Sequence, residues 1–156
     1  MVIQRWQSVL LLIAAVAMGC FTFMSLGQVQ TPEYTLNFTT LGYTYEGVAT
    51  EGGLSGYYEH TSFLFVLSLA STLLPLISIF LFKNLSLQIK MCMVSILLLL
   101  GTAAYCGVSG YTAVPEAAVS WSSVIIGAAV ALCAELMAIK YIRRDANLLR
   151  AVDRIR

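Results

Sequence analysis

Glu135 is the acidic residue whose position could support chemistry inside a membrane, because it lies well within a long apolar run. It ends a series spaced four residues apart along one helix face, consisting of Ser123, Gly127, Ala131 and Glu135. The small residues predict close contact with a second helix. An acid inside a membrane suggests a function such as proton coupling. The alternative, which we favour, is that Glu135 reaches the cytoplasmic interface or a basic loop residue such as Lys90.

The other residue types that support catalysis or metal binding are isolated. His60 is the only histidine, and with Glu59 beside it the set is too small for a metal site or a catalytic triad. The cysteines all lie in apolar runs, at Cys20, Cys92, Cys106 and Cys133. We expect them to be small buried hydrophobes, and a disulfide between Cys20 and Cys106 stays open as an alternative. The sequence therefore predicts no catalytic residue, no metal site and no cofactor.

Four apolar runs, which contain Glu135 and the four cysteines, are long enough to cross a bilayer as helices. They are residues 6–26, 61–82, 91–108 and 119–142. Each is near the roughly 20 residues that a helix needs to cross a hydrocarbon core of about 30 Å. Short connections between the later runs make successive helices antiparallel neighbours. We therefore predict an all-α membrane protein. It would be an antiparallel bundle of four transmembrane helices, forming a single domain over residues 1–156.

The nine Lys and Arg residues predict the orientation of these helices. All nine lie on one side of the alternating pattern, whereas residues 27–60 and 109–118 contain acidic but no basic residues. Basic residues near the ends of spans keep their loops in the cytoplasm. We therefore expect a cytoplasmic N-terminus, a cytoplasmic tail at residues 143–156 and an outer loop at residues 27–60. Because topology already accounts for the basic residues, we expect no nucleic-acid binding.

The outer loop contains a period-two pattern typical of β-strands. Aromatic and aliphatic residues alternate with polar ones over residues 34–39 and again over residues 43–46. A turn near residues 40–42 would join two short strands of this kind. We therefore predict a small β-hairpin in the outer loop.

The second apolar run carries a stripe of small polar residues and proline at helical spacing. Its members are Ser68, Ser71, Thr72, Pro75 and Ser78. Pro75 lacks a backbone donor and frees the carbonyl of Ser71, and nearby hydroxyls can satisfy such freed groups within a membrane. We interpret the stripe as a helix-packing surface; the alternative interpretation is a path for a solute.

The tail has the pattern of a short basic amphipathic helix. Its apolar residues recur at intervals of three and four, at Leu148, Leu149, Val152 and Ile155, with arginines on the other faces. Such a helix could lie on anionic phospholipid headgroups or dock on a partner protein through bidentate arginine contacts. We favour docking. The residues expected to contact a partner or headgroups are Gln4, Arg5, Leu149, Arg150, Val152, Asp153, Arg154 and Arg156.

Both ends of the chain resemble a known family. The chain begins MVIQRWQ and ends DANLLRAVDRIR. These motifs are similar to the M-I-Q-R-x-Q start and the D-x-x-L-V-R-S-x-D-R-L-R end of the family known as domain of unknown function 4293. Val2 looks inserted, and Ala151 replaces the usual serine. The resemblance implies a small four-span inner-membrane protein of Bacteroidota whose cytoplasmic terminal motifs belong to its role. It implies no activity.

These observations favour a non-enzymatic accessory or scaffold subunit that binds other membrane proteins. The identifiable side chains lie at the chain ends and in the outer loop, whereas the apolar runs lack a catalytic set. The first alternative is a small transporter or lipid-handling protein that uses Glu135 and the hydroxyl stripe. The second is a membrane enzyme similar in size to the four-helix glutathione-transferase-like family, which no polar constellation in the apolar runs supports.

Overall fold

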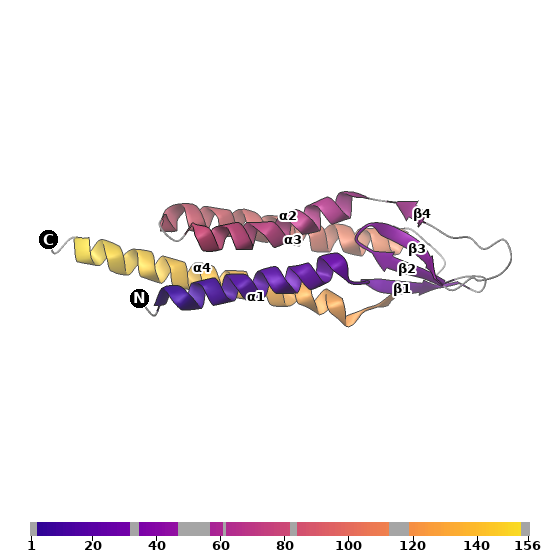
Figure 1. Ribbon diagram of the computed structural model, residues 1–156, viewed down its shortest axis with the longest axis horizontal. Helices are drawn as coiled ribbons and strands as arrows, with labels where there is room; N and C mark the ends of the chain where they lie inside the picture. The colour runs from indigo at the N-terminus through magenta and orange to yellow at the C-terminus, as the bar shows by residue number, and fades with distance from the viewer. Residues whose placement is uncertain are drawn as a thin grey trace.

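In the computed structural model, long helices lie along one axis and a small antiparallel sheet covers one end of them (Figure 1). The structure describes residues 3–31, 35–46, 57–60, 62–81, 84–112 and 119–153. The helices are α1 (Ile3–Phe23), α2 (Ser62–Phe80), α3 (Leu85–Thr112) and α4 (Ile126–Asp153), and the 3-10 turn η1 (Ser123–Ile125) precedes α4. The strands are β1 (Gly27–Gln30), β2 (Thr35–Thr39), β3 (Gly42–Glu46), β4 (Tyr57–His60) and β5 (Val119–Trp121).

Within these described ranges, four helices are long and apolar enough to cross a membrane. Large apolar side chains lie exposed on their outer faces, as Leu97 does on α3 and Phe80 on α2. The interior is built instead from small, apolar and hydroxyl-bearing residues. An exposed apolar surface of this extent around a partly polar interior is the arrangement expected of helices surrounded by lipid.

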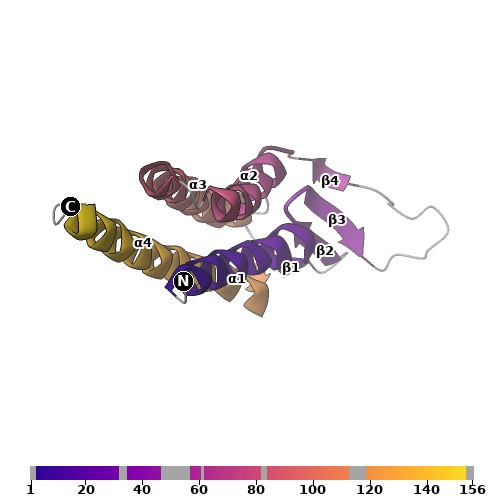
Figure 2. The same cartoon turned by 60° about the vertical axis from the view of Figure 1, so that its left-hand side comes forward.

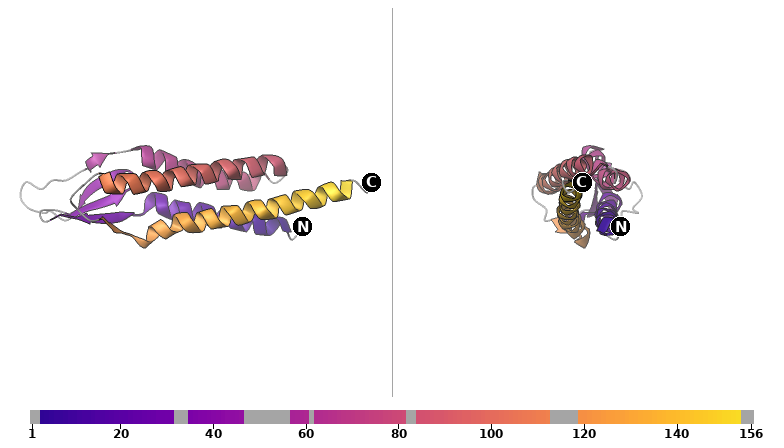
Figure 3. Two further views of the ribbon diagram at one scale, coloured as in Figure 1. Left: turned by 180° about the vertical axis from the view of Figure 1, so that it is seen from behind. Right: turned by 90° about the vertical axis from the view of Figure 1, so that its left-hand side faces the viewer.

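Each helix packs against two others. α1 contacts α2 and α4, and α3 likewise contacts α2 and α4. The view along the helices in Figure 3 shows this ring, and both chain ends lie away from the sheet (Figure 1). The C-terminal end of α4 reaches beyond the start of α1 (Figures 1 and 2). The predicted side-by-side placement of successive helices is therefore found.

The predicted hairpin is confirmed as β2 and β3, which pair antiparallel from Thr35↔Glu46 to Thr39↔Gly42. Gly42 adopts a positive φ of 126°, which glycine tolerates and side-chain-bearing residues avoid. Three further strands were not predicted. They extend the hairpin into a five-stranded sheet with the order β4-β3-β2-β1-β5.

Strand β1 joins two segments that are far apart in the chain, because it pairs with β2 on one side and with β5 on the other. A Cβ atom at Gly27 would lie 2.9 Å from the main-chain oxygen of Ser120, so this pairing requires glycine. Ser120 also donates from its hydroxyl to the Gln28 carbonyl, at 2.8 Å. The fold is therefore mostly helical, with a sheet that is larger than the predicted hairpin.

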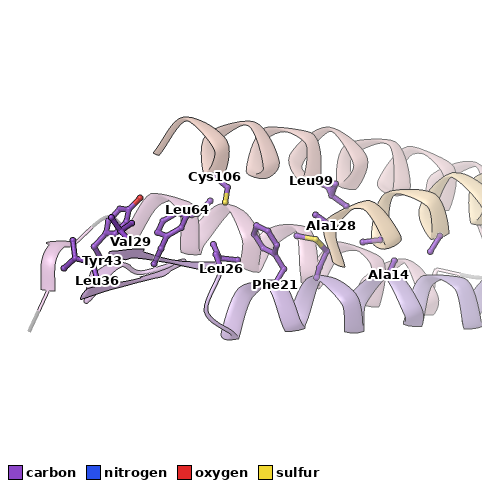
Figure 4. Packing of buried hydrophobic residues seen from close by; sticks show 14 residues of the cluster. Ala14, Phe21, Leu26, Val29, Leu36, Tyr43, Leu64, Leu99, Cys106 and Ala128 are labelled. Atoms are coloured by element: carbon purple, nitrogen blue, oxygen red, sulfur yellow. The ribbon is translucent and has the colours of Figure 1, made fainter. Parts of the chain in front are cut away.

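One face of the sheet is continuous with the helix interior. Val29, Leu36 and Phe38 are buried and belong to the same cluster as Phe21 of α1 and Leu64 of α2 (Figure 4). The alternating burial along β1 and β2 matches a sheet with one covered face. The sheet thus covers the helix ends as part of a shared core.

Several predicted boundaries were wrong. The run predicted to open the fourth span at residue 119 begins instead with β5, because β1 offers its backbone groups as partners. The helical segment starts after Ser122, whose hydroxyl caps η1 by accepting from the Val124 amide. Residues 83–90, which lie between the second and third predicted spans, were expected to form a loop. Most of them form the first turns of α3, which begins at Leu85. The helical pattern of the tail is found as the continuation of α4 to Asp153.

Candidate functional site

The Glu135 side chain is fully buried, with 0% of its surface exposed. Ser95 on α3 donates from Oγ to Glu135 Oε1 at 2.7 Å. The second carboxyl oxygen, Oε2, is also buried and receives no hydrogen bond from the described residues. The expected contact with Lys90 is not found among the described residues, since Lys90 is exposed and Glu135 faces inward.

The depth of Glu135 follows from where α4 begins. The helix starts at Ile126 rather than at residue 119, and it continues well past Lys140. At 1.5 Å per residue, Glu135 lies about 14 Å from the start of α4, in the interior of the helix rather than near its end. A buried carboxyl group that is paired with a hydroxyl rather than a cation is costly to retain.

Further polar side chains of α2 and α3 are buried, and those of α3 lie on the same helix face as Ser95. Gln88 donates from Nε2 to the main-chain oxygen of Ser78 at 3.1 Å, and its Oε1 is buried without a partner in the described residues. Cys92 is fully buried on α3, one helical turn from both Gln88 and Ser95. We call Ser78, Gln88, Cys92, Ser95 and Glu135 the inner polar cluster. Three helices contribute to it.

A separate group of hydroxyls, the outer polar cluster, connects α1, α2 and α3 nearer the sheet. The Thr22 and Thr72 hydroxyls are 3.2 Å apart, and those of Ser71 and Thr102 are 3.3 Å apart. Thr22, Thr72 and Thr102 also donate to carbonyls of their own helices. The predicted stripe of α2, Pro75 included, is the buried face of that helix. These bonds agree with its interpretation as a packing surface.

The predicted small-residue contact of α4 is made with α1. A Cβ atom at Gly127 would lie 3.1 Å from the main-chain oxygen of Ala17, so the two backbones approach closely here. Ala131 is fully buried in the same cluster as Ala14 of α1. Ser123 does not take part, because it is exposed and lies in η1, before α4 begins. We call this contact the α1–α4 seam.

The two terminal motifs meet at the far end of the α1–α4 seam. Gln7 is 3% exposed, and its side-chain amide donates to the Asp145 carboxylate. Asp145 Oδ1 is buried and has no hydrogen bond from the described residues. The bond therefore fixes α4 beside the start of α1, at the end opposite the sheet.

The contact between α3 and α4 is looser and leaves two grooves. The outer groove, of about 510 Å³, is lined by residues that include Cys106, Tyr111, Trp121, Ser122 and Ile126. The inner groove, of about 620 Å³, has walls formed by Met93, Ile96, Leu97, Leu136 and Ile139. Lys140 and Arg143 complete its lining. Figure 3 shows α3 and α4 alongside each other from behind the view of Figure 1.

The residues predicted to contact a partner or headgroups gather at one end of the molecule. Gln4 and Arg5 are in the first turn of α1. Leu149, Arg150, Val152 and Asp153 are in the last turns of α4. Arg154 and Arg156 lie outside the described residues. The structure thus brings the backbone of both predicted segments to the end away from the sheet (Figure 1).

The remaining candidates are dispersed. His60 and Glu59 lie in β4, at an edge of the sheet. All four cysteines are free, with Cys20 exposed and Cys106 buried, so the alternative of a disulfide between them is not found. In the part of the chain that the structure describes, no three His, Cys, Asp or Glu residues come close enough to hold a metal ion.

Sequence reasoning missed Ser95 and Gln88 as partners within the inner polar cluster, and Gln7 and Asp145 as partners of each other. A signal existed for the first two: they are seven residues apart in an apolar run, which places them on one helix face. For Gln7 and Asp145, the signal was their membership of the terminal motifs. Their pairing across the length of the chain had no local signal.

Comparison with known proteins supports the resemblance of the terminal motifs. No curated protein matches the chain. The sequence profile described as Domain of unknown function (DUF4293) matches residues 3–155, which include Gln7, Glu135 and Asp145. The chain therefore belongs to the domain of unknown function 4293 family.

Proposed function

We propose that this protein crosses the bacterial inner membrane four times, as an antiparallel bundle with both termini in the cytoplasm. The charge asymmetry of the loops supports this orientation. The placement of the described basic residues supports it too. Arg5 and Lys90 lie near the starts of α1 and α3, and the basic residues of α4 begin at Lys140. These parts of the three helices all lie at the end away from the sheet (Figure 1). Its resemblance to a family of Bacteroidota supports a Gram-negative inner membrane.

Reporter fusions test the orientation. A reporter after Arg156 should be active on the cytoplasmic side, and one inserted at Glu51 within the outer loop on the opposite side. The same side for both would contradict the four-span arrangement.

In this membrane, the protein acts as a non-enzymatic accessory or scaffold subunit for other membrane proteins. The observation that carries this proposal is the continuity of α4, which runs as one helix from Ile126 to Asp153. Its 28 residues span about 42 Å, longer than a hydrocarbon core of about 30 Å. The end of the helix therefore reaches beyond α1, away from the sheet (Figures 1 and 2). A basic helix extended into the cytoplasm is suited to docking on a partner or on anionic headgroups.

Purification in mild detergent tests the scaffold role. The protein should recover partner membrane proteins in stoichiometric amounts, and a chain that ends after Asn147, which keeps the Gln7–Asp145 bond, should recover fewer of them. Recovery of a partner-free monomer from native membranes would contradict the scaffold role and favour the second candidate.

The second candidate is a small transporter or lipid-handling protein, and the burial of Glu135 favours it. A membrane-buried acid without a cation partner is a common element of proton relays. In sealed vesicles that contain the purified protein, a proton-coupled flux should disappear in Glu135→Gln and persist in Glu46→Gln, whose acid lies on the sheet. An equal flux in both variants, or none with the unaltered protein, would exclude this role for Glu135.

A further inference from the structure

The inner groove between α3 and α4 combines an apolar channel with cations at one end. Its walls are apolar and include Leu97 of α3 and Leu136 of α4, which are 70% and 52% exposed. Lys140 and Arg143 line the same groove from the following turns of α4. Both cations are exposed, and neither forms a hydrogen bond or ion pair with the described residues.

The nearest acidic groups do not neutralise these cations. Glu135 faces inward and pairs with Ser95, while Asp145 accepts its hydrogen bond from Gln7 of α1. Lys140 and Arg143 are thus free to bind an anion. Arginine favours phosphate through its planar set of donors, and lysine attracts phosphate as a compact charge.

The dimensions of the inner groove fit a lipid chain below such a phosphate. Leu136 and Arg143 are about 10 Å apart along a helix that rises 1.5 Å per residue. One leaflet of a hydrocarbon core is about 15 Å deep, so the groove would hold the headgroup-proximal part of an acyl chain. Its volume of about 620 Å³ is in the range of sites that hold small molecules.

We propose that the inner groove is a binding site for one anionic phospholipid of the cytoplasmic leaflet. Its phosphate lies between Lys140 and Arg143, and one acyl chain lies along the apolar walls formed by α3 and α4. The site depends on the proposed membrane orientation, which puts this end of the helices in the cytoplasmic leaflet. The charge complementarity favours an anionic lipid, because a zwitterionic lipid would bring its own headgroup cation close to Lys140 and Arg143, and a partner's apolar helix would leave both cations unpaired.

Native mass spectrometry of the detergent-purified full-length protein tests the site, with phosphatidylglycerol and phosphatidylcholine of identical acyl chains as probes. The double variant Lys140→Gln, Arg143→Gln should bind phosphatidylglycerol about tenfold more weakly. Its binding of phosphatidylcholine should fall less, because the choline cation of that lipid already offsets part of the attraction between its phosphate and the two side chains. The matched control is Lys90→Gln, Arg144→Gln, which removes the same charge from exposed positions outside the groove and should lose less than threefold.

A second pair of variants tests the apolar channel. Leu97→Trp should fill the groove and weaken the binding of both lipids, whereas Leu100→Trp, also exposed on α3 but outside the groove, should not. Millimolar inorganic phosphate should not displace the lipid, because it cannot use the apolar walls. Equal losses in the two charge variants would indicate attraction to surface charge alone and overturn the proposal. So would displacement by phosphate, or binding unaffected by Leu97→Trp. A wrong membrane orientation would be detected separately by the reporter fusions.

Discussion

Helix α4 has two seams that differ in how closely its neighbour approaches. Toward α1, Gly127 and the buried alanines let the two backbones approach closely. A Cβ atom at Gly127 would lie 3.1 Å from the main-chain oxygen of Ala17, so the main chain of α1 would have to shift to accept it. Toward α3, the side chains are larger and leave two grooves, with one buried polar contact, Ser95–Glu135, on the interior side. The same helix therefore holds the fold together on one face and leaves space for ligands on another.

The difference arises from side-chain size at equivalent spacing. Small residues let helices without a hydrophobic driving force between them gain close van der Waals contact within lipid. Leu136, Ile139 and Arg143, on the α3 side, hold the backbones apart and leave space that side chains do not fill. We therefore expect substitutions in the α1–α4 seam to affect stability, and those lining the grooves to affect binding.

The largest effect is expected from Gly127→Val. Its side chain would collide with the main chain of Ala17, and we expect the free energy of unfolding to fall by about 2–3 kcal/mol. Thermal unfolding in mild detergent measures the change. Gly107→Val is the matched control, because a Cβ atom at Gly107 on α3 meets nothing within 4 Å. Equal destabilisation by both would mean that the two seams do not differ as described.

The next effect is expected at the end of the α1–α4 seam that lies away from the sheet. Gln7→Leu removes the donor to a partly buried carboxylate and should destabilise the protein by about 1–2 kcal/mol. Gln30→Leu, on the exposed side of β1, should have little effect. Replacing both partners, with Gln7→Leu and Asp145→Leu, should restore most of the stability, since neither polar group is then left unpaired. Additive losses in the double variant would argue against a direct bond.

A smaller effect is expected for the polar contact between α3 and α4. Ser95→Ala leaves Glu135 without its donor and should cost about 0.6–1.7 kcal/mol, the range for hydrogen bonds between membrane helices. Glu135→Gln keeps an acceptor for Ser95 and should cost less. Ser86→Ala, the same change at an exposed position of α3, is the control. If Ser86→Ala lowered the free energy of unfolding as much as Ser95→Ala, the hydrogen bond between Ser95 and Glu135 would not account for the loss.

The smallest effect on stability is expected beyond both seams, in the tail. Replacing Arg150, Arg154 and Arg156 by lysine should change the free energy of unfolding by less than about 0.5 kcal/mol. Partner recovery in pull-downs should nevertheless fall, because lysine does not reproduce bidentate arginine contacts. The comparison variant is Leu149→Asp, Val152→Asp, which should also reduce recovery. Unchanged recovery in both variants would refute docking through the tail.

The sequence was most informative where a pattern is local. The long apolar helices follow from runs of residues whose length alone matches a bilayer, and the β2–β3 hairpin follows from alternation over adjacent residues. The close approach at Gly127 was expected from small residues spaced four apart, although its partner helix was not. These features need no knowledge of distant parts of the chain.

The features that sequence reasoning missed depend on pairing between distant segments. Residues Val119–Trp121 are apolar enough to begin a helix, and they form a strand only because β1 lies beside them. Because these residues form a strand, α4 starts at Ile126 rather than at residue 119, and Glu135 lies nearer to the start of its helix than the sequence predicted. Gln7 and Asp145 likewise acquire their bond only once the two ends of the chain meet.

The α1–α4 seam also determines the order in which this protein can be completed. It joins the first helix, which ends at Phe23, to the last, which begins at Ile126, and the β1–β5 pairing joins the same two parts of the chain. The ribosome adds about 5–20 residues per second, so α1 is made about 5–20 s before α4 begins to emerge. During that time the small-residue face of α1 is inside the membrane without its partner. A truncated chain that lacks α4 would keep this face of α1 uncovered permanently.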